Sequence, residues 1–197
     1  RYYALNIFEE LDSPGEWYLD DANDTLFYKP KDSELVANGN FNLPIVIPST
    51  TTFFNIQAAH HVEFKGLSFQ CSNWTAPSDL GYISFLQAGI NYITVASTYG
   101  KYCSIPGMIT LLNPKEVKVE ECKFSFGGAW GIMEVGANSA GNQYIGNVFE
   151  NLASGAICVG NEESINHEWV TAPAGAPDGD IIANNFISKI GYMYRDA

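Results

Sequence analysis

The stretch from Lys115 to Gly160 decides the fold, and it reads KEVKVEECKFSFGGAWGIMEVG, then ANSA, then GNQYIGNVFENLASGAICVG. Its second half repeats the plan of its first half: a short apolar run, a lone Phe, a turn that contains Gly, another apolar run and a closing Gly. The interval from Phe124 to Phe149 is one residue longer than the interval between the closing glycines at 136 and 160. A period of this size, about 25 residues, is typical of stacked repeats, in which each unit covers the apolar face of its neighbour.

The same frame extends over most of the chain. Four segments align on a Phe, and they end at Phe69, Phe124, Phe149 and Phe186. The second interval is one period, the first is slightly longer than two periods, and the third is about one and a half periods. The first interval predicts two repeats, with one further repeat around residues 81–93 and the next one opening at 108–112. The third interval predicts a single repeat plus an excursion over residues 162–177.

The alignment also predicts which side chains point inward. Five positions before each Phe stand residues able to fill a core: Phe64, Val119, Tyr144 and Ile181. Two positions before the last two Phe residues stand Asn147 and Asn184, which we expect to stack at a corner and bond backbone groups of adjacent repeats.

Each repeat contains two or three short strands, and no stretch has the 3.6-residue apolar pattern of an amphipathic helix. Gly and Asn cluster between the strands, where left-handed backbone angles cost least. The sequence therefore predicts an all-β fold, namely a right-handed parallel β-helix with repeats of about 25 residues. The handedness follows from the general rule for parallel crossovers.

Residues 1–50 do not repeat. Two aromatic-rich runs, EWYLD at 16–20 and TLFYK at 25–29, flank a polar segment, which is the pattern of a β-hairpin with a four-residue turn. We therefore expect two parts: a hairpin and loop region over 1–50 that packs on the repeats, and the β-helix over 51–197. The chain stops inside what looks like an unfinished repeat, so we expect further repeats beyond it.

The charge balance restricts the partners. The chain has 10 Lys plus Arg against 22 Asp plus Glu, a net charge of −12, and it has no long basic run. Nucleic acid is therefore disfavoured as a partner, and so are strongly anionic glycans. A neutral ligand fits this charge better. No apolar run approaches the length of a membrane span, about 18 residues.

With these residues placed, the chain resembles the secreted right-handed parallel β-helix proteins of polysaccharide-degrading bacteria and fungi. The matching stretches are EELDSPGEWYLDDANDTLFYKP (9–30), VEFKGLSFQCSNW (62–74), GYISFLQAG (81–89), the pair CKFSFGGAWGI and GNVFENLASGAICVG, and ISKIGYMYRDA at the end. Some members near this group are similar to glycoside hydrolase family 141. The resemblance implies a secreted, extracellular protein that acts on a polysaccharide or oligosaccharide without a cofactor.

Glycoside hydrolysis usually needs two carboxylates on either side of the scissile bond. Matching GIMEVG with GAICVG pairs Met133 with Ile157 as inward residues, so Glu134 should face outward as a candidate catalytic carboxylate; an ordinary surface glutamate is the alternative. Asp196 is the second candidate, with Tyr192, Tyr194 and Arg195 as its substrate-binding neighbours. A surface Arg–Asp pair is the alternative there. Trp130 is either a further substrate-binding ring or a plug at a corner.

Other candidate sites rest on weaker patterns. The adjacent residues His60 and His61 point to opposite sides of a strand, so we expect no metal site there. Asp20, Asp21 and Asp24 surround a turn that could hold Ca²⁺, although their spacing matches no calcium loop. A disulfide between Cys71 and Cys103 is an option in a secreted protein. Two Asn-X-Thr triplets make Asn23 and Asn73 candidate glycosylation sites.

Three functions remain open from the sequence. The first is a glycoside hydrolase that uses paired carboxylates on a neutral glycan. The second is a non-catalytic extracellular β-helix, such as an adhesin, a self-associating fibre component or a glycan-binding rod, because the repeat alone fits that class equally well. The third, a polysaccharide lyase, would use a Lys or Arg base and a bound cation to hold a uronate, and the negative charge argues against such an anionic substrate. A carboxylate pair lining a groove would favour the hydrolase.

Overall fold

The structure of the chain is a computed structural model. It describes residues 6–36, 43–74, 106–136, 138–160 and 179–191, and the backbone of the strands at 84–85, 90–93 and 101–104. The described residues are mostly strands, with two 3-10 helices of three residues, Phe8–Glu10 and Asp32–Glu34. The chain divides into two compact units, Arg1–Val46 and Ile47–Ala197. The predicted boundary after residue 50 lies close to this division.

The first unit contains the predicted hairpin. Strands β1 (Trp17–Asp20) and β2 (Thr25–Tyr28) pair antiparallel, with residues 21–24 as the turn. The Asp20 carboxylate closes this turn: its Oδ1 accepts hydrogen bonds from the backbone N–H groups of Ala22 at 3.1 Å and Asn23 at 3.3 Å. The hairpin prediction is confirmed, because an Asx-type turn supplies the reversal that the polar segment indicated.

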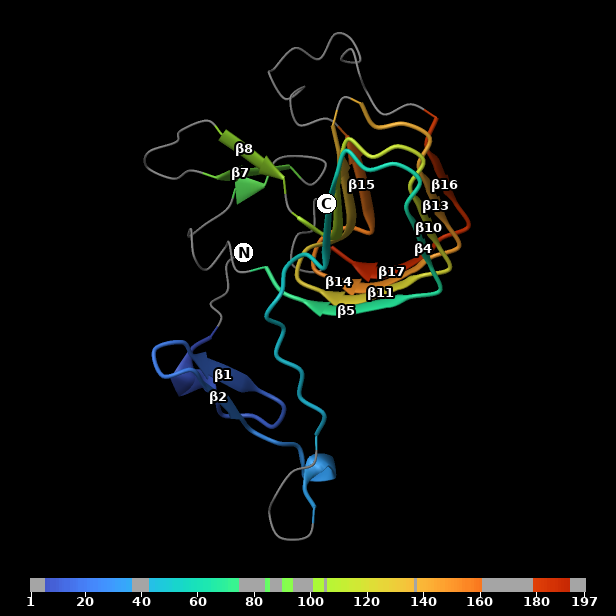
Figure 1. Cartoon of the computed structure of the whole chain (residues 1–197). Coiled ribbons are helices and arrows are strands. Elements are labelled where there is room, and N and C mark those ends of the chain that lie inside the picture. Colours follow the sequence, from blue (N-terminus) through green and yellow to red (C-terminus); the bar gives the residue numbers. More distant parts are fainter. Residues whose placement is uncertain are drawn as a thin grey trace. The chain divides into compact units, whose positions relative to one another are not determined.

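Three four-stranded parallel sheets build the second unit (Figure 1). Sheet I consists of β3 (Phe54–Gln57), β9 (Gly107–Leu112), β12 (Trp130–Val135) and β15 (Ile157–Gly160). Sheet II consists of β4 (Glu63–Lys65), β10 (Lys118–Glu120), β13 (Gln143–Ile145) and β16 (Ile181–Ala183). Sheet III consists of β5 (Ser68–Ser72), β11 (Lys123–Gly127), β14 (Val148–Leu152) and β17 (Phe186–Ile190).

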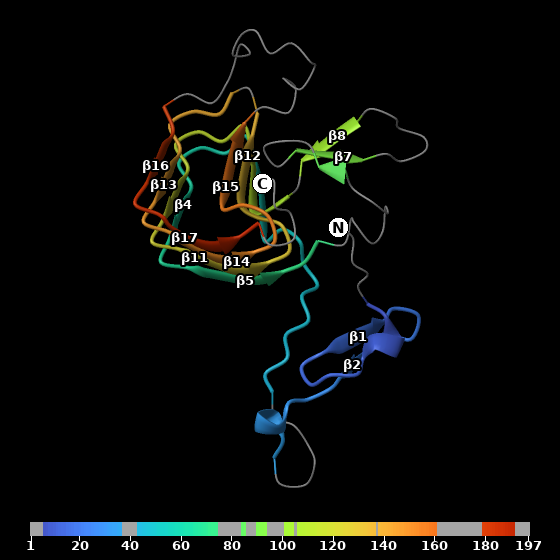
Figure 2. The same ribbon diagram turned by 180° about the vertical axis from the view of Figure 1, so that it is seen from behind.

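The chain visits the three sheets in a fixed order. It runs from sheet I to sheet II to sheet III and then starts again, so that each strand lies beside its counterpart from the next passage (Figure 2). We number these passages as repeats 1 to 4, which contain β4, β10, β13 and β16 as their sheet II strands. This arrangement agrees with the predicted all-β class and with the predicted parallel pairing of repeats.

One predicted repeat does not exist. Strand β4 pairs directly with β10, and β5 pairs directly with β11, so the interval from Phe69 to Phe124 holds a single repeat and a long excursion. The segment predicted as a repeat around residues 81–93 instead contributes to a separate antiparallel sheet of β6 (Ser84–Phe85), β7 (Ile90–Ile93) and β8 (Lys101–Ser104). The single repeat predicted for the third interval is confirmed by the pairing of β13 with β16. Its excursion, 162–177, lies outside the described residues.

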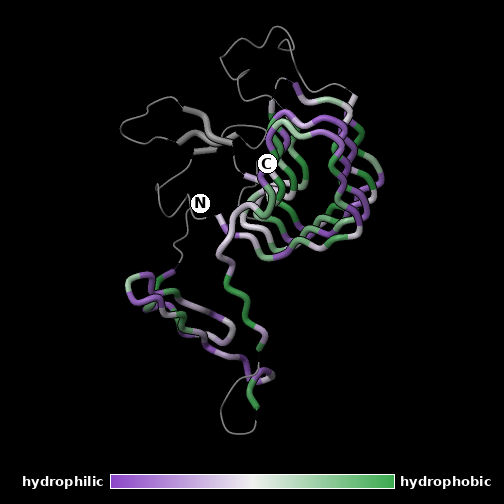
Figure 3. The backbone as a smooth tube through the Cα atoms, viewed as in Figure 1, coloured by the Kyte–Doolittle hydropathy of each residue, from purple (hydrophilic) through white to green (hydrophobic). Residues whose placement is uncertain are grey.

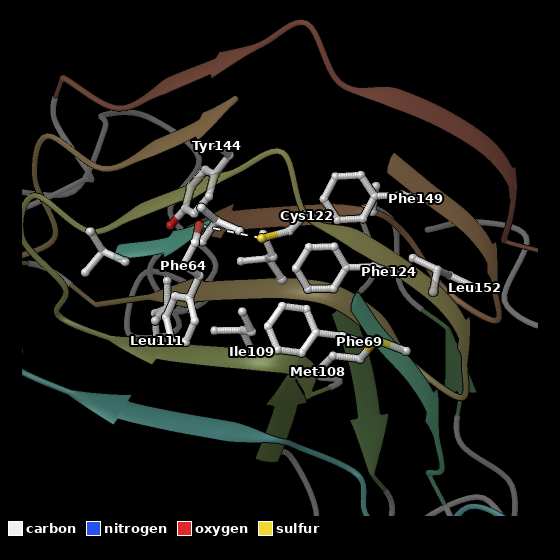
Figure 4. Close-up of a cluster of buried hydrophobic side chains, with 14 residues drawn as sticks. Phe64, Phe69, Met108, Ile109, Leu111, Cys122, Phe124, Tyr144, Phe149 and Leu152 are labelled. Atoms are coloured by element: carbon white, nitrogen blue, oxygen red, sulfur yellow. Dashed lines mark hydrogen bonds between the residues drawn. The ribbon is translucent and has the colours of Figure 1, made fainter. Parts of the chain in front are cut away.

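The interior is a stack of aromatic and aliphatic side chains. Phe124 is fully buried between Phe69 and Phe149, with ring centroids 4.9 Å and 4.8 Å away (Figure 4). In repeat 4 the partner of Phe149 is Ile187 and not Phe186, which is 57% exposed. The inward positions of Phe64, Val119 and Tyr144 are confirmed, whereas Ile182 and not Ile181 aligns with Tyr144. Figure 3 shows the hydrophobic positions that recur along the stacked strands.

Left-handed backbone angles recur at the same positions of the repeats, at three corners and within the strands of sheet III. Four columns of residues have positive φ: Ala58, Asn113 and Gly136; His61, Glu116, Gly141 and Gly179; Gly66, Glu121, Gly146 and Asn184; and Cys71, Phe126, Asn151 and Lys189. Glycine or Asn at several of these positions agrees with the predicted corners. The other side chains adopt the same angles at a cost, because a β-carbon disfavours the left-handed region.

Asparagine side chains join the repeats at the corners before sheets II and III. Asn147 Oδ1 accepts from Cys122 N–H at 2.9 Å, and Asn185 Oδ1 accepts in turn from Asn147 N–H at 2.8 Å. Asn185, and not the predicted Asn184, therefore continues this ladder. A second ladder precedes sheet II, where Asn142 Oδ1 accepts from Val117 N–H at 3.0 Å.

Candidate functional site

Glu134 lies in the interior of the repeats and not on their surface. Its side chain is 0% exposed, and β12 pairs it with Leu111 of β9 and Val159 of β15. The predicted outward orientation is therefore wrong. The sequence alignment paired Met133 with Ile157, whereas the structure pairs Ile132 with Ile157. A register error of one residue moves every side chain of a strand to the opposite face.

Both carboxylate oxygens of Glu134 accept hydrogen bonds from repeat 3. Asn142 Nδ2 donates to Oε1 at 3.0 Å, and the Tyr144 hydroxyl donates to Oε2. Tyr144 is itself fully buried, and burial together with the neighbouring Glu134 carboxylate raises the pKa of its hydroxyl, which therefore stays protonated and remains a donor. The donors explain how a carboxyl group is tolerated in an otherwise apolar interior, since a buried polar group without partners is costly.

A second carboxyl group, that of Asp180, approaches the same place from repeat 4. Asp180 Oδ1 accepts from Asn142 N–H at 2.7 Å, while Oδ2 is buried and has no hydrogen-bond partner among the described residues. Burial, followed by the negative charge of Asp180, raises the pKa of Glu134 to about 7, although the hydrogen bonds from Tyr144 and Ser139 act in the opposite direction. We call Glu134, Asn142, Tyr144 and Asp180 the interior carboxyl cluster.

The interior carboxyl cluster has no access for a polysaccharide. Glu134, Asn142 and Tyr144 are each 0% exposed. A catalytic carboxylate has to reach the glycosidic oxygen or the anomeric carbon within hydrogen-bonding distance. Glu134 therefore serves the interior of the repeats, and the sequence-based assignment of this residue to glycan cleavage has no geometric support.

Trp130 is also enclosed. Its side chain is 6% exposed and packs in a small apolar cluster with Ala129 and Met133. A β-carbon on Gly155 would lie 1.9 Å from the Trp130 ring, so the indole fits against a backbone that only glycine allows. Of the two sequence-based alternatives, the geometry is that of a plug and not of an exposed stacking ring.

The edge of sheet III at β5 carries the features that a ligand could reach. An open hollow of about 460 Å³ lies there, lined by Phe53, Ser68, Phe69 and Gln70. Gln70 Nε2 donates to Ser68 Oγ at 3.1 Å, which holds the amide and the hydroxyl together at the rim. The two phenyl rings are stacked with centroids 6.3 Å apart. The lining of the hollow thus consists of two aromatic and two polar residues, of which Phe69 is 7% exposed.

Phe126 is an exposed aromatic residue on the same sheet. It lies on β11, next to β5, and its ring is 59% exposed. Its φ of 55° places it in the left-handed column with Cys71 of repeat 1 and Asn151 of repeat 3. A bulky residue in this region is a conformational outlier that costs about 1–3 kcal/mol. Sequence reasoning missed Phe126, because the repeat frame was aligned on Phe124 and nothing in the sequence marks the next Phe as exposed.

The remaining sequence-based candidates are only partly covered by the described residues. Asp196, Tyr192, Tyr194 and Arg195 lie outside the described residues, as does the side chain of Cys103. Cys71 has a free thiol.

The candidate glycosylation sites and the acidic turn also use their polar groups locally. Asn23 lies in the exposed hairpin turn, where its Nδ2 donates to Asp20 Oδ2 at 2.8 Å. Asn73 uses both amide atoms, accepting from Thr51 Oγ1 at 3.0 Å and donating to the carbonyl oxygen of Pro48 at 3.2 Å. Within the described part of the chain, no group of three or more His, Cys, Asp or Glu residues is arranged to hold a metal ion.

The comparisons with known proteins leave the family open. No protein-family model, no curated protein and no solved structure matches the chain. Among the residues that the structure describes, no helix has the length and the apolar character needed to cross a membrane.

Proposed function

We propose that the chain is an extracellular carbohydrate-binding protein, built as a right-handed parallel β-helix, and that it binds a neutral glycan at the β5 edge of sheet III. The hollow at β5 carries this proposal. A sugar ring has an apolar face and a rim of hydroxyl groups, so it is complementary to a site with aromatic side chains beneath and polar side chains around it.

Phe126 extends this site along the sheet. Gly127 of β11 pairs with Ser72 of β5, so the preceding residue, Phe126, lies on the strand next to the hollow. An exposed ring held on a rigid strand offers a second stacking surface at a low cost in conformational entropy. A glycan that spans the hollow and Phe126 would therefore be bound at two points.

The charges near this edge favour a neutral ligand. Lys123 and Glu150 form an ion pair of 3.0 Å on the neighbouring strands, so these two charges offset each other. The net charge of −12 would repel an anionic glycan over a longer range. Neutral glycans are free of this penalty.

Binding without cleavage is favoured over hydrolysis for the described residues. A glycoside hydrolase holds two carboxyl groups about 5–10 Å apart around the scissile bond. Of the residues that line the hollow, none is acidic, and the nearby Glu150 is engaged by Lys123. A hydrolytic role would depend on Asp196, outside the described residues.

The test is binding of the full chain to a panel of neutral and anionic polysaccharides, measured by affinity electrophoresis and calorimetry. Phe126→Asn is the central variant, because Asn151 occupies the same column in repeat 3 and Asn accepts the left-handed angles. We expect this variant to fold at least as stably as the wild type and to bind at least about tenfold more weakly, or about 1.4 kcal/mol. Gln70→Ala should also weaken binding.

Trp17→Ala is the matched control, since Trp17 is an equally exposed ring (61%) in the other unit. It should leave binding unchanged. Wild-type affinity in both Phe126→Asn and Gln70→Ala would refute the proposed site. Release of reducing sugar by the wild type would replace binding alone by hydrolysis.

A further inference from the structure

One buried polar atom of the interior carboxyl cluster, Asp180 Oδ2, has no hydrogen-bond partner among the described residues. In the ladder before sheet II, the corner side chains of repeats 3 and 4 each accept the backbone N–H of the corner residue one repeat earlier. Asn142 does so with Oδ1 and uses its Nδ2 as a donor to Glu134 and to the carbonyl oxygen of Pro114. Asp180 repeats the first half of this pattern by accepting from Asn142 N–H. Its second oxygen cannot donate, because a carboxylate has no proton.

A buried acceptor beside a second carboxyl group can be satisfied by a proton. The donors around the cluster are already assigned: Asn142 Nδ2 and the Tyr144 hydroxyl both point to Glu134. A proton on the Glu134 carboxyl group would remain free to bond Asp180 Oδ2. Two carboxyl groups that share one buried site hold such a proton more tightly than either does alone.

We propose that the Glu134 carboxyl group keeps a proton and donates it to Asp180 Oδ2, and that this hydrogen bond holds repeat 4 against repeat 3. When the proton is lost, two negative charges face each other in the interior. The contact that fails is the one that Asp180 makes, so β16 and β17 loosen from β13 and β14 while repeats 2 and 3 remain paired. The pairing of repeat 4 with repeat 3 therefore depends on pH.

The elements around Glu134 contribute no compensating cation. Sheet I contributes Leu111 and Val159 on either side, the segment after β12 contributes Ser139 and Asn142, and β13 contributes Tyr144. Asp180 is the other acidic group that acts on Glu134 among the described residues. No Lys, Arg or His is among the described groups that shift the titration of Glu134.

The direction of the pH dependence follows from linkage. The pKa of Glu134 is raised from 4.5 to about 7 in the folded chain, so the folded state keeps a proton that the unfolded chain loses between these values. The stabilisation is complete below about pH 4.5 and is lost as the pH rises through about 7. A factor of ten for each pKa unit would give about 300-fold for complete unfolding, and the opening of repeat 4 releases only the part of the shift that Asp180 causes, so its equilibrium constant should increase over this window by less than that factor.

The experiment is hydrogen exchange of the full chain between pH 4.5 and 8.5, corrected for the intrinsic exchange rate and read at the β16 and β17 amides. In the wild type their protection should fall steeply across neutral pH, whereas protection of β10 and β11 should change little. Asp180→Asn should abolish this fall and increase protection at pH 8, because the amide completes the ladder in the same way as Asn142. Glu134→Gln should also remove the pH dependence.

Glu63→Gln is the matched control, since Glu63 is an exposed carboxyl group of the same unit and its replacement changes the net charge by the same amount. It should retain the wild-type pH profile. The comparison separates the pair from general repulsion in an acidic chain, which added salt would screen. Wild-type protection of β16 and β17 that is flat from pH 4.5 to 8.5 would overturn the proposal. An unchanged profile in a folded Asp180→Asn chain would overturn it as well.

Discussion

Replacing Tyr144 with Phe isolates the hydroxyl group that bonds Glu134. The ring is fully buried in the stack, so the phenyl group fills the same space and the main change is the lost donor to Glu134 Oε2. The cost depends on the charge of the acceptor. A hydrogen bond between neutral groups contributes about 0.5–1.5 kcal/mol, and one to a charged group contributes about 1.5–3 kcal/mol.

The variant should therefore be destabilised more at high pH than at low pH. At pH 5 Glu134 is protonated in the folded chain, and we expect a loss of about 1 kcal/mol. At pH 9 the carboxylate is charged, and we expect a loss of about 2–3 kcal/mol. The Tyr144 bond lowers the pKa of Glu134 against the larger effect of burial, so this pKa should rise further in the variant.

Urea unfolding at both pH values, followed by hydrogen exchange of the β13 amides, measures the two losses. Tyr28→Phe is a suitable control, since the Tyr28 hydroxyl donates to Glu34 Oε2 at 2.6 Å in the first unit, where both residues are partly exposed. It should leave exchange in β13 unchanged. Equal losses at pH 5 and pH 9, or a larger loss at pH 5, would refute the assignment of charge to Glu134.

Two further substitutions test the packing of the repeats. Phe124→Ala removes the middle ring of the Phe69–Phe124–Phe149 stack and should lower the free energy of unfolding by about 3–5 kcal/mol, measured by urea denaturation; a loss below about 1 kcal/mol would contradict the stack. Gly155→Ala places a methyl group against the Trp130 ring, so it should lower the unfolding temperature more than Gly66→Ala does. A β-carbon on Gly66 would meet nothing within 4 Å, and the cost there comes only from the φ of 65°. The reverse order in thermal unfolding would show that Trp130 does not occupy this position.

The period of the chain was readable from its sequence, but the register of sheet I was not. The Phe124–Phe149 alignment is confirmed because large inward rings must stack on each other. Aligning the glycines at 136 and 160 gave a strand register that was wrong by one residue. Gly136 lies at a corner, with φ of 122°, and not on a strand. That single step turned a fully buried carboxylate into a predicted surface residue.

The interior carboxyl cluster was equally hidden from the sequence. Asp180 follows a glycine and has no sequence feature of a buried site, because only the pairing of β13 with β16 brings it beside Asn142. The predicted repeat around 81–93 failed for a related reason. Alternating apolar residues indicate strands, but they do not say which strands pair, and the antiparallel partner of β7 is β8.

The unequal spacing of the repeats sets an order for their assembly. The hydrogen bond from Val117 to Asn142, beside the pairing of β10 with β13, spans 25 residues. The bond from Lys65 to Glu120, which joins β4 to β10, spans 55 residues. Loop-closure entropy grows with the logarithm of length, so the longer closure costs about 0.7 kcal/mol more before any contact forms. Repeats 2 and 3 should therefore form the folding nucleus, onto which repeat 1 is added. Pulse-labelled exchange would then protect β13 before β4.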